Sequence, residues 1–252
     1  MSEKERSDVF ERFQESFSKM DGHFHILEQK VPIELQMEYF KCSEQMRYDN
    51  TPITEEDLSV YKQSLSDTEA TIDRKKFILS ALAVSNEVKA YRVLEEYVQH
   101  PDPEITNWAY MALMESRISL ESELSEEKQI YISTGLGGKG EKLRFYTLFI
   151  ASENKPFEEY QRQIIEREFP YYLTKKNCDI ERLTINDTYV ELLFLIPVRV
   201  DIKTTLDNAV NECNQYGNFL SPLFTITNVK ELSAEDIDKI IKKKHGDDKT
   251  GN

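Results

Sequence analysis

A glycine-rich stretch near the middle of the chain is the segment best suited to chemistry. Glycines let backbone amides approach an anion closely, and a neighbouring lysine adds positive charge. The stretch departs from a Walker A loop, because Gly140 follows Lys139 where that motif has Ser or Thr, and because a helical region precedes it and a strand follows it. We therefore expect a flexible interdomain connection, an anion or phosphate site, or a tight bend against the helical domain. The residues that would bind a ligand are Ser133, Thr134, Gly135, Gly137, Gly138, Lys139 and Gly140.

Other reactive residue types lie in less suggestive settings. His23 and His25 could place two imidazoles on one side of an extended segment, but no third ligand is identifiable, so we expect a polar loop between two helices and neither a metal nor a cofactor. Cys42 falls in an apolar helical series, which favours a small core residue over a nucleophile. The acidic run Glu121–Glu127 and the lysines Lys242–Lys244 are typical of solvated helix faces and ends. Because no nucleophile or base stands out, the sequence favours a non-enzymatic protein.

Composition restricts the class of protein and of partner. The chain has 252 residues, with 32 Lys and Arg against 46 Asp and Glu, and a net charge of −14. This charge opposes polyanions, so we expect neither nucleic acid nor membrane as a partner. The N-terminal sequence lacks the apolar region of a secretory signal, and no apolar stretch is long enough to span a membrane. Three separated cysteines favour reduced thiols and a cytoplasmic location.

The chain changes character near residue 130, which predicts two domains. Residues 1–130 hold 15 basic and 27 acidic side chains (15 − 27 = −12), whereas residues 131–252 hold 17 and 19 (17 − 19 = −2). The predicted fold is α+β, with an α-helical HEAT-like N-terminal domain and a C-terminal ferredoxin-like α/β sandwich that has an antiparallel four-stranded sheet. The expected boundaries are 1–130 for the helical domain, 131–141 for a Gly-rich linker, 142–232 for the ferredoxin-like domain, 233–245 for a C-terminal helix and 246–252 for a disordered tail.

Apolar residues recur at helical spacing throughout the first part. The expected helices comprise one that carries Phe10, Phe13, Phe17 and Met20, and others that begin near Pro32, Thr54, Ile72, Glu87 and Pro103. Before the last of these, a helix stops at Pro101-Asp102-Pro103 and a new helix starts with acidic residues at its positive end. This join, with Ser66-Asp67 as a degenerate echo one repeat earlier, resembles a HEAT-type repeat over about residues 54–117. An irregular helical bundle is the alternative.

The second part alternates strands and helices in the order βαββαβ. The expected elements are a strand at Leu143–Ala151, a helix after Pro156 that stops near Pro170, strands at Cys178–Ile185 and Tyr189–Ile196 joined by a turn at Asn186-Asp187, a helix over Ile202–Cys213, a strand at Phe224–Thr227 and a last helix after Ser233. This order resembles the ferredoxin-like fold over about residues 142–230, which implies that the first and third strands are central. Pairing of the third strand should end or bulge at Pro197.

The sheet raises the question of what covers its second face. Both central strands are apolar on both alternations, whereas the two predicted helices cover one side only. We expect this face to be covered by the helical domain, a second copy of the chain or a small apolar ligand. The helix at 234–244 is expected to cover part of the same face. Aromatic residues of the first strand, Phe145, Tyr146 and Phe149, could stack RNA bases as in RRM domains, but the third strand lacks the matching motif, so RNA is not expected.

Two hypotheses on function follow. The first is a non-enzymatic cytoplasmic interaction or scaffold protein that presents an acidic helical surface to a protein partner and docks or forms a homodimer through its sheet. The second is a regulatory protein that senses a small anion or nucleotide through the sheet face or the loop at residues 133–140. No residues of the chain could be assigned to the activity of a hydrolase or a transferase.

Overall fold

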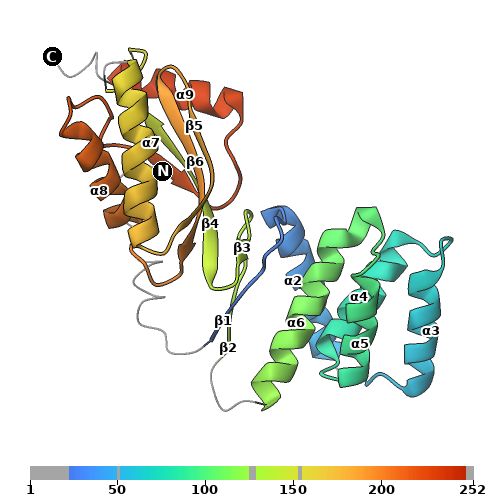
Figure 1. The fold of residues 1–252 in the computed structure, drawn as a ribbon. Coiled ribbons are helices and arrows are strands. Elements are labelled where there is room, and N and C mark those ends of the chain that lie inside the picture. Colours follow the sequence, from blue (N-terminus) through green and yellow to red (C-terminus); the bar gives the residue numbers. More distant parts are fainter. Residues whose placement is uncertain (1–22, 50–51, 125–128, 153–154, 248–252) are drawn as a thin grey trace. The chain divides into compact units, whose positions relative to one another are not determined.

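The computed structural model describes residues 23–49, 52–124, 129–152 and 155–247. Within these ranges the chain is a mixed α+β structure with eight α-helices and an antiparallel sheet. The described residues divide into two compact units, a helical unit that ends at Gly135 and a sheet unit that begins at Leu136 (Figure 1). The predicted helix around Phe10–Met20 and residues 248–252 of the predicted tail lie outside the described residues. Within these ranges, no helix combines the length and apolarity needed to cross a bilayer.

The helical unit follows the predicted helix starts closely. Its elements are β1 (His23–Ile26), α2 (Ile33–Asp49), α3 (Glu55–Ser66), α4 (Ile72–Val84), α5 (Val88–Tyr97), the 3-10 turn η1 (Pro103–Ile105), α6 (Thr106–Leu124) and β2 (Gln129–Ile132). Thr54 caps α3 in a capping box with Asp57, and Thr71 caps α4 through the amide of Arg74. The apolar faces of α2 to α6 share one core, in which Tyr39, Ile78, Leu94 and Trp108 are almost fully buried.

The segment that carries the two histidines is a strand, so the predicted polar loop between helices is wrong. β1 pairs in parallel with β2, with His23 opposite Gln129 and Ile26 opposite Ile132. Phe24 and Ile26 are buried and alternate with the two histidines, which is the period of a strand with one face in the core. A parallel partner more than a hundred residues away along the chain gives no local signal in the sequence.

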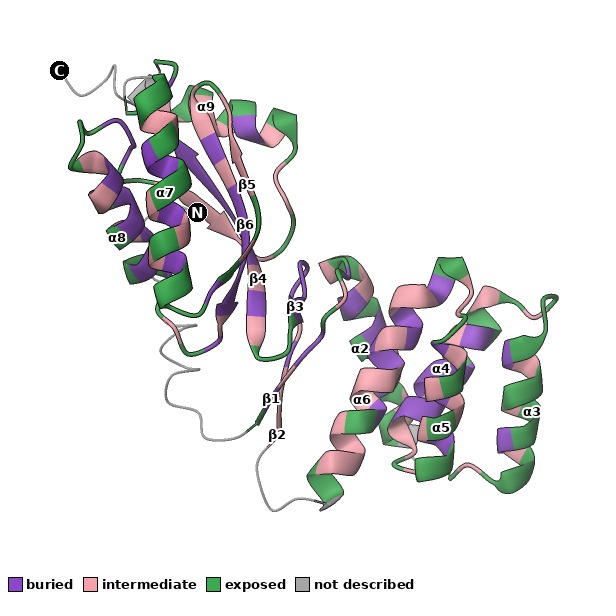
Figure 2. Cartoon of the chain, in the orientation of Figure 1, coloured by how far each residue is buried: buried purple, intermediate pink, exposed green. Residues whose placement is uncertain are grey.

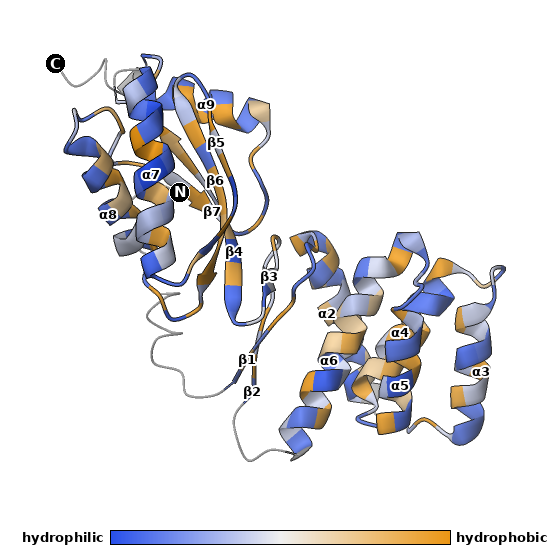
Figure 3. Cartoon of the chain, in the orientation of Figure 1, coloured by the Kyte–Doolittle hydropathy of each residue, from blue (hydrophilic) through white to orange (hydrophobic). Residues whose placement is uncertain are grey.

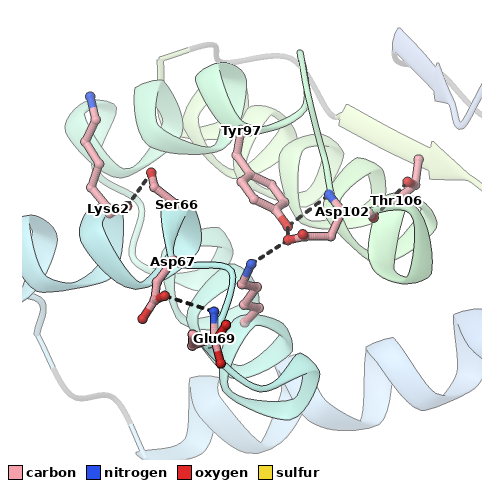
Figure 4. A network of polar contacts seen from close by, with 8 residues as sticks. Lys62, Ser66, Asp67, Glu69, Tyr97, Asp102 and Thr106 are labelled. Carbon is pink, nitrogen blue, oxygen red and sulfur yellow. Dashed lines mark hydrogen bonds and ion pairs between the residues drawn. The ribbon is translucent and has the colours of Figure 1, made fainter.

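Two aspartates organise the turns between the paired helices of this unit (Figure 4). At the α3–α4 turn, Asp67 accepts a hydrogen bond from the amide of Glu69 at 2.9 Å. At the α5–α6 turn, the Asp102 carboxylate accepts hydrogen bonds from the Tyr97 hydroxyl at 2.5 Å and from the Lys75 ammonium at 2.7 Å. Lys75 is only 3 % exposed and belongs to α4, so this ion pair ties one helix pair to the next.

The sheet unit contains the predicted strands with the first and third at the centre, but the predicted four-stranded sheet is wrong, because a short fifth strand at Gly138–Lys139, within the expected linker, pairs with the start of the first. Its elements are β3 (Gly138–Lys139), β4 (Lys142–Ile150), α7 (Glu159–Lys175), β5 (Asp179–Ile185), β6 (Tyr189–Pro197), α8 (Ile202–Asn214), β7 (Thr225–Thr227) and α9 (Ala234–Asp247). The strands lie in the order β3-β4-β6-β5, and β7 pairs with β4. β4 and β6 are therefore central and mostly buried, as Figure 2 shows, and β6 ends at Pro197 as expected.

The two faces of this sheet are covered by different helices. On one face, Phe149 of β4 contacts Phe169 of α7, with ring centroids 4.9 Å apart. On the other face, Tyr146 and Leu148 of β4 share a small core with Ile237 of α9. Because side chains alternate along a strand, this parity places α7 and α9 on opposite sides of the sheet. The helix at 234–244 thus covers the apolar face, and the predicted docking or dimerisation through a bare sheet face is wrong.

Helix α7 continues through Pro170, where the sequence predicts that it stops. A proline inside a helix removes one backbone hydrogen bond and crowds the preceding turn. The helix nevertheless runs to Lys175, because Phe169 and Leu173 on either side of the proline are both fully buried. Their burial offsets a cost of about 3 kcal/mol for an interior proline. The extra turn adds Tyr171, Tyr172 and Lys175 to the helix surface.

Candidate nucleic-acid interface

The structure divides the predicted glycine-rich site between the two units. Ser133, Thr134 and Gly135 close the helical unit, and the rest of the stretch belongs to the sheet unit. The hydroxyl of Ser133 donates to the side-chain oxygen of Gln36, a buried residue of α2, whose amide group donates to the carbonyl of Thr134 at 3.1 Å. These contacts give the first half of the stretch a structural role at the end of β2.

The second half of the stretch forms a hairpin. Gly138 and Lys139 make up β3 and pair with the start of β4, and Gly140 takes a positive φ of 57° in the turn between them. Gly137 also has a positive φ, of 67°, and its carbonyl accepts a hydrogen bond from the amide of Arg144 at 3.0 Å. Glycine is therefore explained at these two positions by backbone conformation. Anion binding by the stretch stays a prediction.

The other residues considered for chemistry are placed as follows. His25 lies 2.6 Å from the side-chain oxygen of Gln129 and 3.2 Å from a carboxylate oxygen of Glu121. Among the described residues, no group of three or more His, Cys, Asp and Glu side chains is arranged to hold a metal ion. Cys42 packs against the helical core. Burial raises the pKa of the Cys178 thiol to about 11 and that of Cys213 to about 12, so both stay protonated at neutral pH.

A row of exposed aromatic and cationic side chains lies along α7, and sequence reasoning missed it. Tyr160, Arg167, Tyr171 and Lys175 are spaced by seven, four and four residues, which places them on one face of a helix with 3.6 residues per turn. Tyr160 is 47 % exposed and Tyr171 is 52 % exposed. In Figure 3, α7 is a largely hydrophilic helix with hydrophobic residues in between. The outer side of α7 is thus a polar surface that carries aromatic rings.

Tyr216, just after α8, extends this surface onto the neighbouring helix. It is 51 % exposed, and the guanidinium of Arg167 lies 5.6 Å from its ring centroid. Arg167 also donates a hydrogen bond to the Tyr216 hydroxyl at 3.3 Å, which joins α7 to the end of α8. We call the set of Tyr160, Arg167, Tyr171, Lys175 and Tyr216 the α7–α8 face.

Cation–π contacts join the side chains at the C-terminal end of α7 on this face. The Lys175 ammonium lies 3.8 Å from the ring centroid of Tyr171 and 5.5 Å from that of Tyr172, and the two rings meet edge to face. A hydrogen bond with Glu212 raises the pKa of Tyr172 to about 12. Over the residues that the structure describes, neither Lys175 nor Lys176 forms an ion pair, whereas Arg167 is paired with Glu168 at 2.7 Å. The two lysines leave positive charge beside half-exposed rings.

Nucleobases cannot stack on the sheet itself in this structure. The aromatic residues of β4 that the RRM comparison identifies, Phe145, Tyr146 and Phe149, are all 4 % exposed or less. Phe149 faces α7 and Tyr146 faces α9, so helices cover both faces of the sheet at these residues. Among the described residues of the sheet unit, the exposed rings are instead Tyr160 and Tyr171 on α7 and Tyr216 just after α8.

Comparison with known proteins gives only distant likenesses. No protein-family model matches the chain, and no curated protein matches it. Among solved structures, a candidate transposase from Deinococcus radiodurans R1 is 15 % identical over 40 % of this chain and 90 % of its own, with a TM-score of 0.36. The REP-associated tyrosine transposase bound to a REP hairpin is 14 % identical over 46 % of this chain and 67 % of its own, with a TM-score of 0.31.

These comparisons correct two predictions. Both neighbours are described as transposases, not as scaffold or HEAT-repeat proteins, and one of them is bound to a nucleic-acid hairpin. These descriptions contradict the prediction of a non-enzymatic interaction protein and the prediction that nucleic acid is not a partner, and neither prediction is kept. At TM-scores below 0.5, the likenesses transfer neither a site nor an activity to this chain.

Proposed function

We propose that the sheet unit binds single-stranded nucleic acid through the α7–α8 face. The observation that carries the proposal is the row of three half-exposed tyrosines, Tyr160, Tyr171 and Tyr216, interleaved with Arg167 and Lys175. Surfaces that bind single strands without sequence preference combine aromatic rings, on which bases stack, with cations that follow the phosphates. The REP hairpin belongs to the neighbouring protein, and the proposal for this chain depends on its own side chains.

The charge distribution supports this proposal despite the negative net charge of the chain. Most of the negative charge belongs to residues 1–130, at 15 − 27 = −12, and residues 131–252 carry only 17 − 19 = −2. A strand lying along α7 would meet Lys175 and Lys176 with no paired carboxylate among the described residues. With about three phosphates contacted, the slope of log K against log salt would be about −2 for a single strand. Stacking then supplies most of the affinity.

The test is a fluorescence anisotropy titration of the full chain with a labelled oligothymidine strand. Replacing Tyr171 by Ala should weaken binding by roughly 5- to 150-fold, since stacking contributes about 1–3 kcal/mol per base. Tyr171→Phe should retain most of the affinity because the ring remains. The matched control is Tyr48→Ala, which removes a tyrosine that is 90 % exposed in the helical unit.

Three outcomes decide the matter. Loss of affinity for the strand in Tyr171→Ala but not in Tyr48→Ala supports binding through the α7–α8 face. Equal loss with both variants, or none with either, places binding elsewhere on the chain and refutes this face. Absence of any salt-sensitive binding by the unmodified protein refutes nucleic-acid binding altogether.

We also propose finer descriptions of the two units. The pairs α3–α4 and α5–α6, with Asp67 and Asp102 at equivalent turns, are supported as two HEAT-like repeats by the packing of α4 against both α5 and α6. The strand order and the helices on one face support a ferredoxin-like fold for the sheet unit. The free thiols of the three cysteines are consistent with a reducing compartment such as the cytoplasm.

A further inference from the structure

A cavity of about 360 Å³ lies within the helical unit, among α2, α6 and β2. Phe40, Glu44 and Arg47 line it from α2, Met111 and Glu115 from α6, and Tyr131 from β2. None of these residues belongs to the α7–α8 face, so the cavity is independent of the function proposed above. Its volume suits a small organic molecule or one long side chain.

A fixed carboxylate forms one wall of this cavity. The side chain of Glu115 is 11 % exposed, and its two oxygens accept hydrogen bonds from Arg47, at 2.7 Å, and from the hydroxyl of Tyr39. Tyr39 is fully buried, and its pKa is raised by burial first and then by the charge of Glu115. The carboxylate is therefore held in one position by a neutral donor and one cation.

The lining keeps a negative balance. Glu44 stands three residues before Arg47 on α2, so the cavity carries two carboxylates against one guanidinium. That guanidinium already donates to Glu115, which leaves an anionic ligand with no unpaired cation in the lining. The acidic balance of residues 21–135, 11 − 22 = −11, also concentrates cations near this unit.

Two aromatic rings also line the cavity. The rings of Phe40 and Tyr131 have centroids 6.0 Å apart and planes 76° apart, so they meet edge to face. Phe40 is 39 % exposed, whereas Met111 is almost fully buried. Because the two rings are in contact with each other, a cation can approach them only from the cavity side, where nearby carboxylates balance its charge.

We infer that this cavity binds an organic cation of the alkylammonium class, with its charged group against the half-exposed ring of Phe40 and near Glu44 and Glu115. Methyl groups on the nitrogen fit the aromatic surface, whereas a neutral apolar molecule would not balance the charge of Glu44, since Arg47 already pairs with Glu115. The same chemistry is offered by a free quaternary amine and by a methylated lysine side chain of a peptide.

Calorimetric titration of the full chain with choline tests this inference. Choline should bind at least about 10-fold more tightly than 3,3-dimethylbutan-1-ol, its uncharged analogue of the same shape. Phe40→Ala should weaken choline binding by about 5- to 30-fold, and Glu44→Gln by about 3- to 5-fold. Glu56→Gln, at an exposed position of α3, is the matched control and should leave binding unchanged.

The outcomes separate the alternatives. Equal binding of choline and the alcohol, or no effect of either Phe40→Ala or Glu44→Gln, overturns the inference, as does absence of binding. Because Glu44 is exposed, its variant keeps the test informative even if Phe40→Ala fails to fold. A trimethyl-lysine peptide that binds more tightly than choline assigns the site to a peptide side chain, and the reverse order assigns it to a free amine.

Discussion

Removing the Asp102 carboxylate should destabilise the helical unit more than removing its partner, Lys75. In Asp102→Ala, the Lys75 ammonium, whose side chain is 4 % exposed, is left in the core without a counter-charge. In Lys75→Met, the buried charge itself disappears, and Asp102 keeps its hydrogen bond from Tyr97. The asymmetry follows from the cost of leaving a charge unpaired in the protein interior.

The structure sets the size of each effect. Breaking a buried ion pair costs about 3–5 kcal/mol. The Asp102 side chain is 35 % exposed, so part of the interaction is screened by water and we expect a loss of about 2–3 kcal/mol for Asp102→Ala. For Lys75→Met we expect a loss of about 1 kcal/mol or less, because the methionine fills the aliphatic space of the lysine.

The single tryptophan of the chain makes the measurement specific to this unit. Trp108 is 2 % exposed, and its indole N–H donates to the Ser80 hydroxyl at 2.9 Å, on the helix that carries Lys75. Urea unfolding followed by tryptophan fluorescence therefore reports the helical unit alone. Equal losses in the two variants, or a larger loss for Lys75→Met, would refute the reasoning on the unpaired charge.

Two further predictions concern pH and the proline in α7. Hydrogen bonds from Lys75 and then Tyr97 lower the pKa of Asp102 below 3.8. The contribution of the Asp102 carboxylate to the free energy of unfolding is therefore present above that pH and is lost as the pH falls through the lowered pKa. The difference in stability between the unmodified protein and Asp102→Ala, measured by urea unfolding, should shrink below about pH 4, and a constant difference would contradict the lowered pKa. Pro170→Ala should stabilise the sheet unit by about 1–2 kcal/mol, because a helical hydrogen bond becomes available. The measurement is unfolding followed by circular dichroism. Destabilisation would show that the proline ring itself contributes to packing.

The sequence predicted most elements because their signals are local. Thr54 and Ser233 begin helices through hydroxyl caps, and Asn186-Asp187 forms the turn between β5 and β6. The double-sided apolar pattern of β4 and β6 correctly indicated central strands. These features depend on residues close together in the chain, which is the information that spacing contains.

The errors share a different cause. The strand at His23 depends on a partner near Gln129, and the passage of α7 through Pro170 depends on burial of Phe169 and Leu173. Neither is visible from neighbouring residues. The second error also hid the α7–α8 face, because a helix that stops at Pro170 does not bring Tyr171 and Lys175 into line with Tyr160. The spacing of seven, four and four residues was available, but only to an interpretation that allowed a proline inside the helix.

Photo-crosslinking tests the nucleic-acid proposal most directly. A single strand containing 5-iodouracil, bound to the full chain and irradiated, should crosslink to peptides that contain Tyr160, Tyr171 or Tyr216, because stacked bases lie in contact with these rings. Crosslinks confined to residues of the helical unit, or a bound strand that crosslinks to none of the three tyrosines, would contradict the account.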